Sequence, residues 1–218
     1  KYRRKFDSII PTKENKSKYK NVVTLGIGGS FEGPKLLIES LNNDNSDINH
    51  IFITGSDLNE FKDKLSNLNP DETIFIVSSK SFTTDETLET LKEAIKWSGN
   101  IEKFIAITAN KEEAAKYNIK EIIEFDKEIG GRYSIWSDIN LPALYGPKSN
   151  FDPKLFLKGG HQADLDIQNN SDYLNFIKIL SFSDIWFNNF AGKNTRAILS
   201  YSWKLRSFAN YAQQLEME

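Results

Sequence analysis

The sequence predicts an α/β fold in which a doubly wound, mainly parallel sheet is flanked by helices. Two observations carry this prediction. Between residues 21 and 126, short apolar runs alternate with segments of helical spacing, as expected when parallel strands are joined by crossover helices. Among these runs, residues 73–77 (TIFIV) are β-branched apart from one aromatic residue, which is typical of a buried strand.

The expected elements follow one another in strand–helix pairs. Residues 1–20 are rich in charge and are interpreted as a solvated lead-in. The predicted strands cover residues 21–27, 50–55, 73–79, 103–109 and 122–126. The predicted helices cover residues 33–41, 57–68, 88–97 and 111–118. We place Pro34 in the first turn of the first helix, where proline is tolerated because the amide there has no intrahelical partner.

The pattern changes after residue 125. Residues 153–192 are expected to be mostly helical, residues 195–201 form a strand-like run, and residues 203–218 have helical spacing. The last helix should carry one apolar face made by Leu205, Phe208, Ala212 and Leu215. Core packing is the expected role of the aromatic residues of the long helical region, Tyr173, Phe176, Phe182, Trp186, Phe187 and Phe190. We divide the chain into segments 1–20, 21–150 and 151–218.

Composition excludes several classes of function. The 218-residue chain has a net charge of −2, so it has no global attraction to nucleic acid or an anionic membrane. It contains no cysteine, which excludes disulfides and thiolate sites, and its two histidines, His50 and His161, are isolated. No apolar run approaches the ~20 residues of a membrane span, and the basic N-terminal stretch does not resemble a signal peptide. We expect a cytoplasmic protein that needs no metal or other cofactor.

A glycine-rich segment, GIGGSFEG, follows the first predicted strand and contains Gly26, Gly28, Gly29 and Ser30. Glycines at such a turn allow a close approach of an anion to the backbone and to the start of a helix. The segment is not the dinucleotide fingerprint, because Phe31 occupies its third glycine position, and no Gly-Lys-Ser/Thr follows as in a P-loop. Tight-turn geometry explains the glycines equally well, and both interpretations stay open.

A hydroxyl-rich segment, SSKSFTTDET, connects the third predicted strand to its helix at residues 78–87. Its hydroxyls include Ser79, Ser81, Thr83 and Thr84, and Lys80 lies among them. A capping box at the helix start would use only one or two of these hydroxyls. Several short donors at a helix N-terminus suit a phosphate dianion, so we favour phosphate binding over capping alone.

Four segments together resemble the phosphoglucose (glucose-6-phosphate) isomerase family: GIGGSFEGP, SSKSFTTDET, GGRYSIWS and QQLEME. They occur in the family's order and at compatible spacing across residues 21–218. The resemblance implies a sugar-isomerase (SIS-type), flavodoxin-like three-layer domain over residues 21–150. Residues 151–218 would be a helical connection and the start of a second such subdomain. The implied enzyme interconverts glucose 6-phosphate and fructose 6-phosphate through a cis-enediolate, in glycolysis and gluconeogenesis.

The resemblance also assigns roles to individual residues. It implies substrate binding by Gly29, Ser30, Ser79, Lys80, Ser81, Thr84, Gly131 and Gln214. It implies that Glu218 is the catalytic base and that Arg132 stabilises the enediolate charge. Ser81 stands where the family usually has threonine, which preserves the hydroxyl.

The family's ring-opening histidine and a later lysine have no counterpart in this chain. We therefore expect a fragment that covers mainly the first sugar-isomerase domain and is inactive alone. The full-length protein is expected to form a homodimer.

Three alternatives are weighed against this interpretation. A non-enzymatic sugar-phosphate sensor would need the hydroxyl-rich loop but neither Arg132 nor Glu218. Another sugar-phosphate isomerase is disfavoured by the GGRYS and QQLEME segments. A nucleotide-binding Rossmann domain is disfavoured by the incomplete glycine fingerprint.

Overall fold

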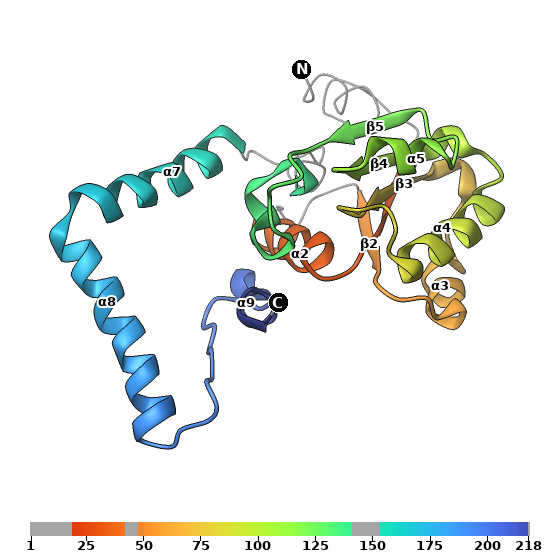
Figure 1. The fold of residues 1–218 in the computed structure, drawn as a ribbon. Coiled ribbons are helices and arrows are strands. Elements are labelled where there is room, and N and C mark those ends of the chain that lie inside the picture. The colour runs from red at the N-terminus through yellow and green to blue at the C-terminus, as the bar shows by residue number, and fades with distance from the viewer. Residues whose placement is uncertain (1–18, 42–47, 141–152, 218) are drawn as a thin grey trace. The chain divides into compact units, whose positions relative to one another are not determined.

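The computed structural model describes residues 19–41, 48–140 and 153–217 (Figure 1). The chain divides into two compact units, one formed by Lys1–Asn150 with Ser202–Glu218 and the other by Phe151–Tyr201. The segments drawn from the sequence differ from this division, because they group residues 202–218 with the preceding helices. That residues 151–218 begin a second sugar-isomerase subdomain stays a prediction.

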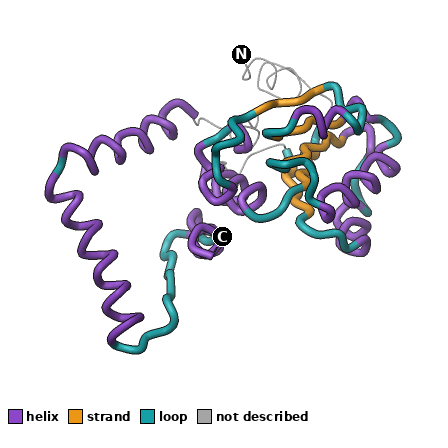
Figure 2. The backbone as a smooth tube through the Cα atoms, viewed as in Figure 1, coloured by secondary structure: helices purple, strands orange, loops and turns teal. Residues whose placement is uncertain are grey.

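The first unit is built on a five-stranded sheet (Figure 2). The strands are β1 (Asn21–Leu25), β2 (Asn49–Ile53), β3 (Thr73–Ser78), β4 (Phe104–Thr108) and β5 (Glu121–Glu124). Their order is β2-β1-β3-β4-β5, and every neighbouring pair is parallel. All five predicted strands of this unit are confirmed, with boundaries that differ by a few residues.

The sheet is covered on both faces, as predicted. Successive strand residues point to opposite faces of the sheet. In β1, the side chain of Val23 therefore packs in one hydrophobic core and that of Val22 packs in the other. The first core lies under α3 (Leu58–Leu65), α4 (Asp85–Ser98) and α5 (Lys111–Ala115). On the other face, α2 (Gly29–Leu41) and short 3-10 turns at Gly131–Trp136 and Asp138–Asn140 pack near the strands. The doubly wound fold positions every strand's carboxyl end at one edge.

Helix α2 begins earlier than predicted, at Gly29 rather than at residue 33. Its first turn is already closed by backbone hydrogen bonds, since the amides of Phe31 and Glu32 both donate to the carbonyl of Gly28 (2.9 Å each). Pro34 therefore lies inside the helix and not in its first turn, which corrects the prediction. The early start matters because it brings Gly29 and Ser30 to the carboxyl edge of the sheet.

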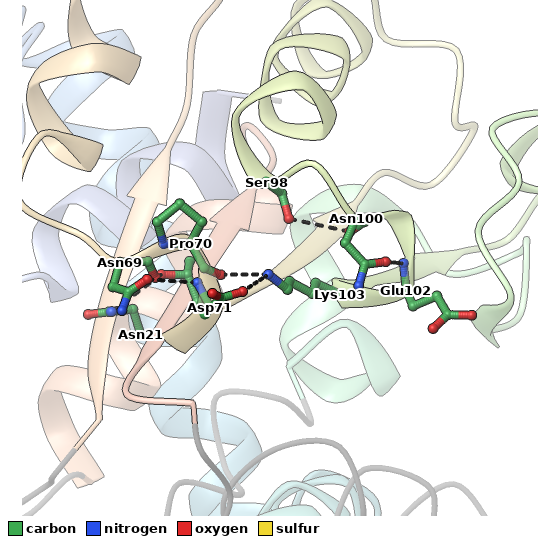
Figure 3. Close-up of polar contacts among 9 residues, drawn as sticks. Asn21, Asn69, Pro70, Asp71, Ser98, Asn100, Glu102 and Lys103 are labelled. Carbon is green, nitrogen blue, oxygen red and sulfur yellow. Dashed lines mark hydrogen bonds and ion pairs between the residues drawn. The ribbon is translucent and has the colours of Figure 1, made fainter.

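The amino ends of the strands are joined by a polar cluster around a buried lysine (Figure 3). The side chain of Lys103 is only 6% exposed, and its ammonium donates to the carbonyl of Pro70 and to Asp71, both at 3.0 Å. Nearby, Asn21 Nδ2 donates to Thr73 Oγ1 (3.3 Å). These bonds fix the edge of the sheet opposite to the predicted site.

Helix α9 (Phe208–Met217) returns to this unit and packs on α2. The Ser207 hydroxyl donates to Glu39, and Ser40 Oγ donates to the carbonyl of Lys204 (2.8 Å). Of the predicted apolar face, Ala212 alone is buried, while Leu205 and Phe208 are exposed within the described chain. The helix is thus held largely by polar contacts at its start.

The second unit consists of α7 (Pro153–Asn169), α8 (Ser171–Ile185) and a π-helical turn at Trp186–Phe190. Asn170 separates the helices and caps α8, since its side chain accepts from the amides of Asp172 and Tyr173. The predicted helical region is confirmed. The predicted strand at residues 195–201 is wrong, because these residues have no regular structure and no described strand pairs with them.

The expected core packing of the aromatic residues in this region is also not seen. Phe176, Phe182, Trp186, Phe187 and Phe190 are all more than half exposed, because no described element of their unit covers α8. Among all described helices, none is both long and apolar enough to cross a membrane.

Candidate active site

A cavity of about 870 Å³ opens at the carboxyl edge of the sheet in the first unit. It is lined by the loops that follow β1, β3, β4 and β5, by the Gly131–Trp136 turn and by α9. All eight residues predicted to bind substrate line this cavity, namely Gly29, Ser30, Ser79, Lys80, Ser81, Thr84, Gly131 and Gln214. Residues separated by up to 185 positions are thus brought to one cavity.

The hydroxyl-rich loop between β3 and α4 is ordered by its own serines. The amide of Phe82 donates to Ser79 Oγ (3.1 Å), and the amide of Thr83 donates to Ser81 Oγ (3.2 Å). Because each serine oxygen accepts from the backbone, its O–H hydrogen can point to a ligand. Ser79 Oγ also lies 3.4 Å from Thr84 Oγ1.

The start of α4 is not closed by a capping side chain. Thr84 occupies the N-cap position with extended backbone, yet it makes no side-chain capping bond. Among the described residues, no acceptor binds the amides of Asp85, Glu86 and Thr87, which belong to the first turn of the helix. A capping box therefore does not account for the hydroxyls, and the helix start retains donors and a partial positive charge.

The same loop is attached firmly to the sheet and its core. The carbonyl of Lys80 accepts from the amide of Ala109 (3.0 Å) and from Thr108 Oγ1 (3.1 Å). Phe82 adopts φ 54° and buries its ring against Tyr117 in an edge-on contact. A non-glycine residue with positive φ is uncommon and is often found where a binding loop is held in one shape.

The glycine-rich turn serves mainly to bring backbones together. Gly28 has φ 56°, a conformation that favours glycine. The first amides of α2 already have acceptors inside the turn. The Ser30 amide donates to the carbonyl of Ile27 (3.0 Å), and the Phe31 amide donates to the carbonyl of Gly28 (2.9 Å). Tight-turn geometry thus explains these glycines better than direct anion binding by the helix start does.

Two long-range contacts complete the cavity wall. Ser134 Oγ donates to the carbonyl of Gly29 (3.1 Å), which holds the Gly131–Trp136 turn against α2. Beside Gly28, a Cβ would lie only 3.4 Å from Gln214 Nε2, so α9 delivers Gln214 to the glycine-rich turn. Neither contact is visible in the sequence, because the partners are 105 and 186 positions apart.

The two predicted catalytic residues are placed differently. Arg132 is half-buried beside Gly131 but does not line the cavity, and its side chain makes no hydrogen bond or ion pair within the described residues. Glu218 lies outside the described residues. Their catalytic roles stay predictions.

Further cavity residues were missed by the sequence analysis. Asn110 follows β4 and Lys127 follows β5, and both line the cavity together with Ser134. The general rule that ligands bind beyond the carboxyl ends of parallel strands could have indicated the first two. Lys80 and Lys127 give the lining a positive charge, and no described carboxylate lines it. This charge balance suits an anionic ligand.

The described residues contain no cluster of three or more metal-ligating side chains. His161 lies inside α7, and His50 lies on the edge strand β2. Burial lowers the pKa of His50 to about 4. Neither histidine lines the cavity.

The relationship of this site to known proteins is decided by a family model. The model of phosphoglucose isomerase matches residues 7–218. The chain belongs to this family. It is 39% identical over 210 residues to glucose-6-phosphate isomerase of Pseudomonas aeruginosa (strain LESB58), covering 91% of this chain and 38% of that protein. It is 36% identical over 209 residues to glucose-6-phosphate isomerase of Baumannia cicadellinicola subsp. Homalodisca coagulata, covering 91% and 37%.

The fold agrees with a solved structure of the same family. The crystal structure of a glucose-6-phosphate isomerase from Chlamydia trachomatis D/UW-3/Cx superposes with a TM-score of 0.77 and 25% identity. The match covers 90% of this chain and 40% of that one. The sheet described above is therefore a sugar-isomerase domain, and the chain spans about two fifths of the length of these relatives.

Proposed function

We propose that the cavity binds the phosphate group of a hexose phosphate. The observation that carries this proposal is the start of α4, where Thr84 makes no capping bond and the hydroxyl-bearing residues Ser79, Ser81 and Thr84 line one cavity. Lys80 and Lys127 add positive charge at its wall. A phosphate monoester has several acceptor oxygens, which match this number of short donors.

We further propose that this site serves the interconversion of glucose 6-phosphate and fructose 6-phosphate in a full-length protein. The family membership and the names of the relatives support this reaction class over a non-enzymatic sensor. Gly29, Ser30, Gly131 and Gln214 would line the sugar part of the substrate, because they lie in the same cavity as the phosphate loop.

In the proposed mechanism, a carboxylate moves a proton between C1 and C2 of the open-chain sugar. Glu218 would abstract the proton and return it to the neighbouring carbon, which requires a base poised near neutral pH. The negative charge that develops on the enediolate oxygens would be stabilised by the guanidinium of Arg132. The reaction needs no cofactor. The full-length protein is expected to be a cytoplasmic homodimer.

The phosphate site can be tested on the 218-residue chain by titration with inorganic phosphate, fructose 6-phosphate and fructose. We expect the two phosphate ligands to bind and free fructose not to bind measurably. Ser81→Ala should weaken both phosphate ligands by about 10-fold, the usual effect of losing one hydrogen bond to a charged group. Equal affinity for fructose and fructose 6-phosphate would contradict the proposal.

A further inference from the structure

Two hydroxyls at the cavity have no role in the site described so far. Ser78, the last residue of β3, and Thr87, in the first turn of α4, both line the cavity and are 1% and 3% exposed. Neither Ser78 Oγ nor Thr87 Oγ1 has a hydrogen-bond partner among the described residues. Buried hydroxyls in folded proteins almost always have a partner, so an unpaired pair at a cavity wall points to a ligand.

Other buried hydroxyls close by are fully paired. Thr90 lies one turn further along α4, is 4% exposed, and donates to the carbonyls of Gly55 (2.8 Å) and Glu86 (2.9 Å). Thr108, at the end of the neighbouring strand, donates to the carbonyl of Lys80. Among these buried hydroxyls, the unpaired state is therefore particular to the two whose residues line the cavity.

Ser78 is packed closely against the glycine-rich turn that forms another wall of the cavity. A Cβ on Gly26 would lie 2.7 Å from the Ser78 carbonyl oxygen and 3.3 Å from Ser78 Cβ, so glycine at residue 26 permits this close approach. The amides of Asp85, Glu86 and Thr87 have no acceptor within the part of the chain that the structure describes. The side chains of Asp85 and Glu86 are exposed and do not line the cavity, so their charges stay at its outside.

We propose that Ser78 and Thr87 form an inner subsite that donates hydrogen bonds to a phosphate oxygen facing the sheet. This subsite rests on the proposed phosphate site and extends it, because the outer hydroxyls of Ser79, Ser81 and Thr84 would hold the other oxygens. An anionic oxygen fits better than a neutral sugar hydroxyl, since Thr87 belongs to the helix turn whose amides are free.

The subsite can be tested with Ser78→Ala and Thr87→Val in the 218-residue chain, using inorganic phosphate as the probe. Valine keeps the shape of threonine and removes only the hydroxyl. Each substitution should raise the Kd for phosphate by about 10-fold, as expected for a hydrogen bond to a charged partner. The matched control is Thr90→Val, which removes a buried hydroxyl of the same helix that is already paired, and it should leave the Kd unchanged.

Denaturant unfolding without phosphate gives a second readout. Ser78→Ala and Thr87→Val should leave the midpoint unchanged or raise it, because no hydrogen bond is lost, whereas Thr90→Val should lower it. An unchanged Kd in both inner variants, with weaker binding in Ser81→Ala, would overturn the inner subsite and leave the proposed function standing. Failure of the unsubstituted chain to bind phosphate at all would overturn both.

Discussion

Gly29 and Gly131 are packed so closely that a Cβ on Gly29 would lie 2.0 Å from the carbonyl oxygen of Gly131. The first residue of α2 thus touches the backbone of the turn that carries Arg132. Any side chain at residue 29 must push this turn away from the helix, because no real Cβ contact is so short. The contact joins two walls of the cavity, and its loss should affect ligand binding as well as stability.

Gly29→Ala is expected to weaken phosphate and fructose 6-phosphate binding by 10-fold or more and to lower the unfolding midpoint; overpacking of this kind costs about 1–3 kcal/mol. Calorimetric titration and denaturant unfolding measure the two effects. Gly159→Ala is the control, because a Cβ there meets nothing within 4 Å in helix α7. Alanine at residue 159 should stabilise the helix slightly. Equal behaviour of the two variants would refute the importance of the contact.

Thr84→Ala should separate ligand binding from helix capping. Since Thr84 makes no side-chain capping bond, its loss should change the free energy of unfolding by less than about 0.5 kcal/mol. Phosphate binding should nevertheless weaken. Asp57→Ala removes a cap that does accept from the amide of Asn59 (2.8 Å) and should cost about 0.5–2 kcal/mol without affecting phosphate binding. A large stability loss in Thr84→Ala would instead favour the capping interpretation.

Lys103→Met should destabilise the first unit without changing the site. The substitution leaves the carbonyl of Pro70 without its donor, and burying an unpaired polar group costs about 1–3 kcal/mol. Lys120→Met serves as the control, because the ion pair of Lys120 with Glu102 is exposed and should matter little. Urea unfolding compares the two variants. Weaker phosphate binding in Lys103→Met would show that the two edges of the sheet are coupled.

His50 should make stability depend on pH. Burial lowers its pKa in the folded state to about 4, whereas the unfolded chain binds the proton near pH 6.5. The contribution of His50 to the free energy of unfolding is therefore complete above pH 6.5. It is lost as the pH falls toward 4, and the free energy of unfolding decreases by about 3 kcal/mol in total. His50→Gln should remove this part of the pH dependence. The difference between the two unfolding curves across that range is the measurement, and parallel curves would contradict the prediction.

Glu218→Gln in a full-length protein carrying this sequence should lower kcat by about 10² to 10⁴-fold with little change in KM, as expected for loss of a positioned base. A coupled assay with fructose 6-phosphate measures the effect. Ser81→Ala should act differently, mainly by raising KM. Normal turnover by the Glu218→Gln variant would remove the assignment of the base.

The sequence by itself determined the sheet and the position of the hydroxyl-rich loop. Strand periodicity predicted β1 to β5 because buried parallel strands such as residues 73–77 are apolar throughout, a local property of the chain. The density of hydroxyls at residues 79–84 predicted a ligand site. This pattern is also a local property of the chain, because the loop is ordered by hydrogen bonds from its own backbone amides to Ser79 and Ser81. The early start of α2 was missed because it depends on backbone bonds to Gly28 rather than on side chains.

Only the tertiary structure decided which residues meet. The contact of Gly29 with Gly131 and the return of Gln214 beside Gly28 join segments more than 100 positions apart, and no local pattern encodes such pairs. The same holds for the unpaired Ser78 and Thr87, which look like ordinary strand and helix residues until their surroundings are known. It holds again for residues 195–201, whose strand-like pattern forms no strand because strands are stabilised by neighbouring strands, and none is placed beside them among the described residues.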